Sequence, residues 1–352
     1  MEQSREIPVQ QSSDEDLVLL TMLVSIIIPT FNGASRIANC LDALCPQAAA
    51  ASAEIIVVDD GSTDGIGDVI RQYRGVRLIS QVNSGPAAAR NRGAAEAKGA
   101  IILFTDDDCV PTERWLQTMT KPFEDPAVVG VKGTYQTRQR SLVARFVQYD
   151  YEDRYRRMAT QPEIDFVDTY SAAFRRDRFL ELKGYDTSFP VACAEDIELS
   201  YRMSKLGWKM VFEPSAIVYH THPDTLWRYL KKKYKFAFWR MIALRKNPKK
   251  TLKDSHTPQI MKLQLLFPPA LLIAVCSDLL ARFEVPFSYV VCAIFLFTTF
   301  PFAARLVRKD PLVGLGSPFL LAARSGAQFF GVAAGMVSAW RTPARAASES
   351  HA

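Results

Sequence analysis

Three short apolar runs in the first third of the chain, each followed by polar or acidic residues, constrain the fold most. They lie in residues 24–28, 54–58 and 101–104, with Ser25 and Glu54 as the polar exceptions, and segments with helical spacing separate them. Strands that are apolar on both faces need cover on both sides, which helices between parallel strands supply. The alternation predicts an α/β fold with a doubly wound, mostly parallel sheet. In such a sheet, ligands bind beyond the carboxyl ends of the strands.

An acidic triplet, Asp106, Asp107 and Asp108, follows the third run directly. Three adjacent carboxylates repel one another unless a cation lies between them or some of them are protonated. In an extended segment only residues i and i+2 point the same way, so Asp106 and Asp108 form a pair that can hold Mg²⁺ or Mn²⁺. Phosphate oxygens would complete the coordination shell. The alternative is an acidic solvated turn, which the fully apolar strand before the triplet disfavours.

The residues that follow the other strands are also polar. Asp59 and Asp60 begin a turn into a helix, and they are interpreted either as structural or as acceptors for a nucleobase or ribose. Arg90 lies one turn into a helix that starts at Pro86, and it is either a surface residue or a planar donor for a diphosphate or base. Asn32 follows the first strand. These residues alone leave both interpretations open.

A second acidic group stands at Glu195, Asp196 and Glu198, at the start of a segment with helical spacing. Acids in a first helical turn are favoured by the helix dipole, so stability alone can explain them. Glu198 and Arg202 are four residues apart, the spacing of an ordinary supporting ion pair. Asp196 is a candidate functional residue only because it belongs to a wider pattern of segments in the chain.

In chain order, these segments resemble family 2 of the glycosyltransferases, which are inverting enzymes with the GT-A fold. The matching pieces are residues 24–32, 54–64 and 83–93, the acidic cluster 106–108, Phe174-Arg175-Arg176 followed by Gly184-Tyr185-Asp186, and residues 195–207. Each piece is weak alone, and their order over residues 24–220 carries the resemblance. The stretch 121–164, where acceptor recognition usually resides, does not match well.

The resemblance implies a role for each matching residue. Thr30, Asp59, Asp60 and Arg90 would contact the nucleotide, and Asn32 is placed with them at the strand ends. Asp106 and Asp108 would hold the metal and diphosphate, with Asp106 also counted among the donor-binding residues. Asp196 would be the catalytic base. His220 resembles the histidine that often completes the metal site after the last core strand, with His222 as the nearby alternative.

The predicted reaction is transfer of a sugar from a nucleotide-diphosphate sugar, with a UDP-sugar favoured, to a hydroxyl of a lipid-linked or cell-surface glycan acceptor. The resemblance implies inversion at the anomeric carbon and dependence on Mg²⁺ or Mn²⁺. The alternative is a non-catalytic, membrane-tethered nucleotide-sugar-binding protein. A phosphotransfer receiver is disfavoured because it would be shorter and would need a lysine at a late strand end.

The last third of the chain contains apolar segments long enough to suggest a membrane. Residues 285–304 carry no charge, and about 20 apolar residues suffice to cross the hydrocarbon core of a bilayer. Residues 263–277 form a shorter uncharged run broken by Pro268-Pro269, and residues 311–340 are apolar but contain Arg324. These two are predicted as short spans or re-entrant pieces, which gives two to three membrane segments in all.

A basic, aromatic stretch precedes the apolar region, with ten Lys or Arg and no acid in residues 228–250. Such a stretch suits either an anionic lipid surface or nucleic acid, and its position beside apolar segments favours lipid. The positive loop 305–309 and the catalytic side are therefore predicted to face the cytoplasm, with residues 278–284 outside. The sequence does not decide on which side of the membrane the C-terminus lies after the third segment.

The predicted organisation has five parts: an acidic and disordered leader (1–21), a GT-A domain (22–225), a basic interfacial helix (226–255), a membrane region (256–341) and a tail (342–352). Met22 is a candidate working start, because the first strand begins two residues later. The six cysteines show no metal-binding spacing, which indicates a reduced compartment. The predicted location is the cell inner membrane, with the catalytic domain cytoplasmic and no nucleic-acid partner.

Overall fold

The computed structural model describes residues 23–189, 194–246, 257–281 and 285–341. The predicted acidic leader, the tail and the candidate start at Met22 lie outside the described residues, as does the end of the basic stretch beyond residue 246.

Eight strands form one sheet in the order β3-β2-β1-β4-β7-β6-β8-β5. The strands are β1 (Val24–Thr30), β2 (Glu54–Asp59), β3 (Val76–Ser80), β4 (Ile101–Phe104), β5 (Val110–Pro111), β6 (Val128–Gln136), β7 (Ala172–Arg175) and β8 (Lys209–Tyr219). The first four strands of this order are parallel, as are β6 and β8, whereas β7 and β5 run antiparallel to their neighbours. The predicted α/β sheet is confirmed, and four of its seven pairings are parallel.

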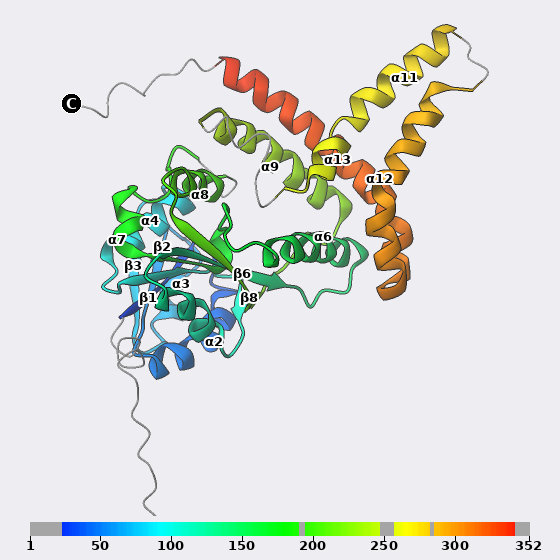
Figure 1. The fold of residues 1–352 in the computed structure, drawn as a ribbon. Coiled ribbons are helices and arrows are strands. Elements are labelled where there is room, and N and C mark those ends of the chain that lie inside the picture. The colour runs from blue at the N-terminus through cyan, green and yellow to red at the C-terminus, as the bar shows by residue number, and fades with distance from the viewer. Residues whose placement is uncertain (1–22, 190–193, 247–256, 282–284, 342–352) are drawn as a thin grey trace, which may run out of the picture.

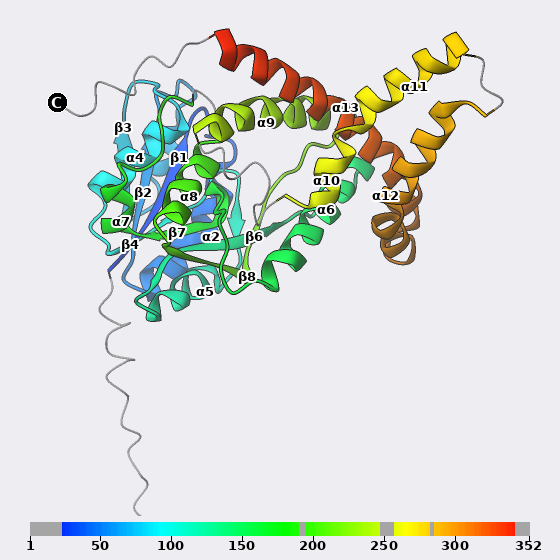
Figure 2. The same cartoon turned by 45° about the horizontal axis from the view of Figure 1, so that its top comes forward.

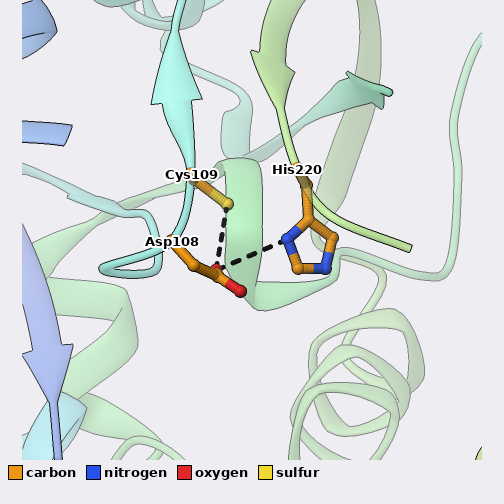
Figure 3. A group of neighbouring side chains, drawn as sticks. All are labelled: Asp108, Cys109 and His220. Atoms are coloured by element: carbon orange, nitrogen blue, oxygen red, sulfur yellow. Dashed lines mark hydrogen bonds and ion pairs between the residues drawn. The ribbon is translucent and has the colours of Figure 1, made fainter. Parts of the chain in front are cut away.

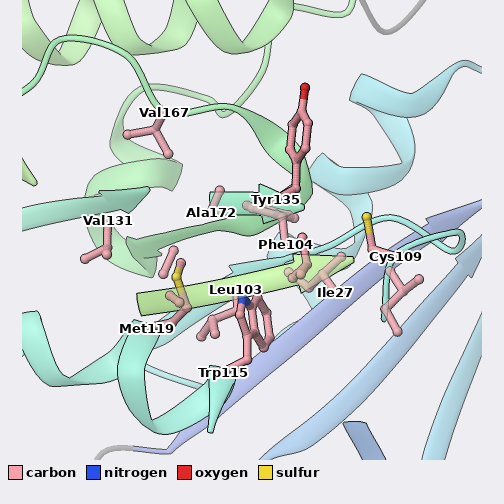
Figure 4. Packing of buried hydrophobic residues seen from close by; sticks show 14 of the residues in the cluster. Ile27, Leu103, Phe104, Cys109, Trp115, Met119, Val131, Tyr135, Val167 and Ala172 are labelled. Atoms are coloured by element: carbon pink, nitrogen blue, oxygen red, sulfur yellow. The ribbon is translucent and has the colours of Figure 1, made fainter. Parts of the chain in front are cut away.

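Helices cover both faces of the sheet, as Figures 1 and 2 show. In the sheet domain they are α2 (Ile37–Ala50), α3 (Ile66–Ile70), α4 (Pro86–Glu96), α5 (Trp115–Thr120), α6 (Leu142–Ala159), α7 (Arg176–Glu181) and α8 (Glu195–Lys205), with short 3₁₀ turns at Lys121–Glu124 and Thr169–Ser171. Every residue of β1 and β4 is buried, which explains why both strands are apolar and β-branched or aromatic. Figure 4 shows Leu103 and Phe104 of β4 in this core beside Trp115, whose indole nitrogen donates a 2.8 Å hydrogen bond to Ser171.

The parallel strands end at one edge of the sheet. Thr30 at the end of β1 pairs in register with Asp59 at the end of β2, and Phe104 at the end of β4 pairs with Ile27 of β1. The polar residues that follow these strands are therefore gathered at the same edge, where the doubly wound topology places a ligand.

Five helices follow the sheet domain: α9 (Leu226–Lys246), α10 (Gln259–Gln264), α11 (Phe267–Ala281), α12 (Phe287–Lys309) and α13 (Pro311–Arg341). Three helical stretches, Gln259–Ala281, Phe287–Lys309 and Pro311–Ser338, are long and apolar enough to cross a membrane. In Figures 1 and 2, α11 and α12 project away from the sheet domain as a hairpin, and α13 runs back beside α9.

Candidate active site

Asn32 joins the loop after β1 to the loop after β2. Its backbone lies in the left-handed region with φ 49°, and its N–H donates a 2.8 Å hydrogen bond to Ser62 Oγ. Its side-chain oxygen accepts a 2.9 Å hydrogen bond from the Thr63 N–H. Asp59 completes the turn by accepting a 2.9 Å hydrogen bond from the Ser62 N–H. Asn32 and Asp59 therefore fix the shape of this edge, and Asp59 is buried within it.

Asp60 fixes the entrance to α4. Its carboxylate is buried and accepts hydrogen bonds of 2.7 Å from Gln81 Nε2, 2.8 Å from the Ser84 N–H and 2.8 Å from the Gly85 N–H. Gly85 precedes the helix with φ 88°, a conformation that glycine adopts without strain. Asp60 thus holds the loop that delivers α4 to the site.

Asp107, the middle residue of the acidic triplet, points into the domain. It accepts a 2.6 Å hydrogen bond from Thr30 Oγ1, and both of its oxygens bind the guanidinium of Arg36, at 2.7 and 2.9 Å. Burial raises the pKa of Asp107, and the hydrogen bonds from Arg36 and Thr30 offset only part of that rise. The hydroxyl of Thr30 is therefore engaged by the acidic triplet.

Arg90 links the end of β4 to the start of α8. One guanidinium nitrogen lies 2.7 Å from Asp106 Oδ1, and another lies 3.2 Å from Glu195 Oε1. The side chain is only 3% exposed, so the interpretation of Arg90 as a surface residue is wrong. Burial lowers the pKa of Arg90, but the negative charges of Asp106 and Glu195 outweigh burial and raise it above its usual value. Three charged groups from separate parts of the chain therefore meet at this point.

Asp196 stands beside this group, in the first turn of α8. It is partly buried, and its Oδ1 accepts a 2.7 Å hydrogen bond from the Ile197 N–H. Removal from water raises the pKa of Asp196 well above the usual range, and the negative charges of Glu195 and Asp168 raise it further. Because Arg90 binds Glu195 and Asp106 together, the helix turn that carries Asp196 is tied to the acidic end of β4.

Asp108, Cys109 and His220 form a separate cluster (Figure 3). His220 Nδ1 lies 3.4 Å from Asp108 Oδ1, and the Cys109 thiol donates a 3.9 Å hydrogen bond to the same oxygen. Pairing of β5 with β8, in which Val110 faces Tyr219, brings His220 beside the acidic triplet. Among the described residues, the ligand atoms within 4.8 Å of one another are those of these three side chains. Asp106 is not one of them.

His222 has a different environment from His220. Its ring is 3% exposed and stacks on Tyr151 at 5.8 Å, and its Nε2 lies 3.1 Å from Gln148 Oε1. Burial lowers the pKa of His222 to about 3, and the charges of His220 and nearby lysines lower it as well. His222 is a packed core histidine, whereas His220 faces Asp108.

The geometry of Asp108 and His220 fits a divalent cation. His220 Nδ1 is buried and makes no hydrogen bond to any residue that the structure describes, although a carboxylate oxygen lies only 3.4 Å away. Neighbouring ligands on an octahedral ion with bonds of about 2.1 Å are about 3 Å apart, close to this separation. Carboxylate and imidazole ligands together suit first-row divalent metals.

Residues 25–182 match the model described as Glycosyl transferase family 2. This segment is therefore similar to glycosyltransferases of that family. The pre-mycofactocin glycosyltransferase of Mycobacterium tuberculosis (strain ATCC 25618 / H37Rv) is 26% identical over 219 residues, which are 60% of this chain and 45% of that protein. An N-acetylglucosaminyltransferase of Azorhizobium caulinodans is 28% identical over 281 residues, 70% of this chain and 67% of the relative. The chain thus spans about half the length of the first of these relatives.

Among solved structures, the mannosyltransferase PcManGT from Pyrobaculum calidifontis superposes with a TM-score of 0.60 at 20% identity, covering 91% of this chain and 89% of that one. This similarity supports the GT-A-like fold, as the family resemblance implied. It covers nearly the whole chain, so the correspondence includes helices beyond the sheet domain.

In the sheet domain, the structure brings together more residues than the motifs indicated. Lys132 of β6 is fully buried and forms an ion pair with Asp168, and its Nζ lies 3.0 Å from Tyr170 Oη. Asp168 in turn raises the pKa of Asp196. Glu195 and Cys109 complete the set that sequence reasoning did not assign. Glu195 stood in the acidic group at the start of a helix, and Lys132 is a lone charge inside an apolar strand, whereas Cys109 gave no signal.

Proposed function

We propose that the chain transfers a sugar from a nucleotide-diphosphate sugar to an acceptor hydroxyl with inversion, using a divalent cation. The observation that carries the proposal is the pairing of Arg90 with both Asp106 and Glu195. It ties the acidic strand end, suited to a metal-bound diphosphate, to the helix turn of Asp196. The residues proposed to bind the donor and the candidate base then lie together at one edge of the sheet.

In the proposed mechanism, Asp196 accepts the proton of the acceptor hydroxyl while the hydroxyl oxygen attacks the anomeric carbon. Attack from the face opposite the diphosphate forms the new glycosidic bond as the bond to the diphosphate breaks, so the configuration inverts. The hydrogen bond from the Ile197 N–H to Asp196 Oδ1 orients the carboxylate. Asp60, Asp59 and Asn32 shape the nucleotide end of the site through the loops they hold.

Asp108 and His220 are the residues proposed to hold the metal. Asp106, which pairs with Arg90, is proposed to face the donor. A bound Mn²⁺ or Mg²⁺ would supply Lewis-acid stabilisation of the negative charge on the leaving diphosphate. PcManGT was solved with GDP-Man and Mn²⁺, which supports Mn²⁺. An imidazole ligand points the same way, because Mg²⁺ prefers oxygen ligands throughout.

The donor is proposed to be a nucleotide-diphosphate sugar, with UDP-sugars first among the candidates and GDP-sugars next because of PcManGT. The acceptor is proposed to be a lipid-linked sugar or a growing surface glycan, because the catalytic domain is continuous with apolar helices. We also propose that the catalytic domain ends at residue 225 and the basic interfacial helix at residue 255. The protein would lie in the inner membrane with its catalytic domain in the cytoplasm. The alternative is that the apolar helices only anchor the domain and do not indicate the acceptor.

A donor screen tests the proposal. Purified full-length chain is incubated with Mn²⁺ and each of a set of UDP- and GDP-sugars, and release of the nucleoside diphosphate is measured with and without extracted membrane lipid. We expect one donor to give release that needs Mn²⁺ and increases with lipid acceptor. Binding of a donor without turnover under any condition would instead support the non-catalytic sugar-nucleotide-binding alternative.

The pH dependence of turnover is expected to follow Asp196. Its pKa lies well above the usual value of about 4 because it is removed from water and because Glu195 and Asp168 carry like charge. A base must be deprotonated to act, so kcat/KM is expected to rise with pH through this raised pKa. Glu195→Gln removes one like charge, and the acidic limb of the kcat/KM profile should move to lower pH. An unmoved limb would assign it to another group.

A further inference from the structure

Arg324 is the one charged residue between Pro311 and Ser338, and it lies in the middle of the third apolar helix. Its side chain is 3% exposed. Its Nη1 lies 2.8 Å from Asp150 Oδ1, and its Nη2 donates a 2.7 Å hydrogen bond to Gln264 Oε1. Arg324 therefore faces protein, and its charge is neutralised by a residue of α6.

Asp150 belongs to the catalytic domain and pairs with cations of three helices, α6, α9 and α13. Its Oδ2 lies 2.8 Å from Arg154 Nη2, on the same helix, and 3.7 Å from Lys233 Nζ on α9. All four charged side chains are buried, and the positive charges of Arg154, Arg324 and Lys233 hold the pKa of Asp150 below its usual range even though burial raises it. One carboxylate with three cations at hydrocarbon depth would be strongly unfavourable.

The end of α12 also contacts α6. Arg305 Nη2 lies 2.6 Å from Asp153 Oδ1, and Lys309 Nζ lies 3.0 Å from Glu152 Oε2. From Pro311 to Arg324 the helix advances by about 20 Å at 1.5 Å per residue. If α13 crossed the bilayer directly after α12, Arg324 would lie beyond the middle of a hydrocarbon core about 30 Å thick. Because Arg324 and the end of α12 both contact α6, both lie on the side of the membrane that holds the catalytic domain.

The rest of α13 packs closely along α9. A Cβ atom on Gly331 would lie 2.4 Å from the carbonyl oxygen of Tyr234, and one on Gly335 would lie 2.7 Å from that of Phe238. The contacts advance by four residues on both helices, so the two helices run in the same direction. On its outer side, α9 exposes Trp227 at 75% together with several lysines and arginines.

The opposite face of α13 is apolar and exposed. Leu312, Leu315, Phe319, Phe330 and Val337 are 53–75% exposed. At 100° per residue these five positions share one sector of the helix, about 140° around from Arg324 and the two glycines. The helix thus presents an apolar stripe on one side, and Arg324 with the close backbone contacts on the other.

We propose that α13 does not cross the membrane. The chain enters the bilayer as the hairpin of α11 and α12, and α13 returns along the surface on the side of the catalytic domain, packed on α9. Its apolar stripe lies in the acyl-chain region of that leaflet, and the exposed basic residues of α9 face anionic headgroups. Lipid is its occupant because α13 follows the apolar hairpin directly in the chain and packs beside exposed basic residues of α9. The C-terminus is consequently on the same side as the active site.

Tag accessibility in the full-length protein tests this placement independently of transferase activity. Short epitope tags are placed before Met1, between Ala281 and Val285, or after Ala352, and sealed membrane vesicles are treated with protease. We expect the N-terminal and C-terminal tags to be digested or protected together, and the tag between α11 and α12 to behave oppositely. A C-terminal tag that behaves like the one between α11 and α12 would overturn the proposal.

Arg324→Leu should change the Tm in opposite directions for an α13 on the membrane surface and an α13 that crosses the membrane. In the proposed arrangement it removes a partner from buried Asp150 and from Gln264, so the Tm of the purified protein in lipid nanodiscs should fall by about 4 °C or more. In a membrane-spanning α13 the same change would remove a charge from lipid and raise the Tm. A raised or unchanged Tm would contradict the proposal.

Two glycines on α13 provide a matched pair of variants. Gly331→Leu places a side chain against the α9 backbone and should lower the Tm, whereas Gly326 has no described atom within 4 Å of its Cβ position, so Gly326→Leu should leave the Tm unchanged or raise it, because leucine favours a helix more than glycine does. Equal effects of the two variants would show that α13 does not pack on α9.

Discussion

Asp196→Asn is expected to lower turnover by about 10²–10⁴-fold while leaving donor binding within about twofold of the unaltered protein. The amide keeps the size of the side chain and can still accept the hydrogen bond from the Ile197 N–H, but it cannot accept a proton from the acceptor. The measurement is the rate of nucleoside diphosphate release at saturating donor, with donor affinity obtained by calorimetry in the presence of Mn²⁺.

The folded state should tolerate this change. An acid whose pKa is raised by folding destabilises the folded protein above its unfolded pKa, because ionisation is then less favourable in the folded state. Asp196 is such an acid, so Asp196→Asn should leave the Tm unchanged or raise it at neutral pH. A loss of turnover that came with a lower Tm would point to unfolding rather than to loss of a base.

Asp177→Asn is the matched control, because Asp177 also lies in a first helical turn but is 74% exposed. It should leave turnover and donor binding unchanged. Full activity in Asp196→Asn would remove Asp196 from the mechanism, and equal losses in both variants would show that the effect comes from the helix terminus.

The arrangement of the strand ends could be predicted from sequence because it depends on local patterns. Apolar runs of β-branched residues define β1, β2 and β4, and parallel strands necessarily end at one edge. The acidic triplet was expected to be extended, but it forms a turn in which the Cys109 N–H donates a 3.1 Å hydrogen bond to the Asp106 carbonyl oxygen. Asp107 turns to Thr30 and Arg36, while Asp106 and Asp108 contact different partners rather than each other.

The partners themselves could not be predicted, because they depend on contacts between distant segments. Arg90 and Glu195 are 105 residues apart, and Arg324 and Asp150 are 174 apart. Nothing in the local pattern around Arg324 distinguishes a charge that faces lipid from one that neutralises a buried carboxylate. Cys109 was overlooked because its neighbours in the cluster come from the triplet before it and from a strand more than a hundred residues later.

His220→Ala and Asp108→Ala are each expected to weaken Mn²⁺-dependent donor binding by about 10–100-fold or more, the range seen when residues that support a metal are removed. Each variant takes one of two ligands from a pair whose atoms lie 3.4 Å apart. Donor affinity measured over a Mn²⁺ titration, with no turnover required, reports the effect. With Mn²⁺ omitted, the variants and the unaltered protein should bind the donor equally weakly.

His222→Ala separates metal binding from packing. His222 stacks on Tyr151 and is hydrogen-bonded through Gln148, so its removal should lower stability by about 2–4 kcal/mol and leave the Mn²⁺ titration within about twofold. The two histidines are only 6.0 Å apart, yet the expected effects differ in kind because only His220 has an unpaired nitrogen facing a carboxylate. If His222→Ala shifted the Mn²⁺ titration and His220→Ala did not, the metal ligand would be His222 and not His220.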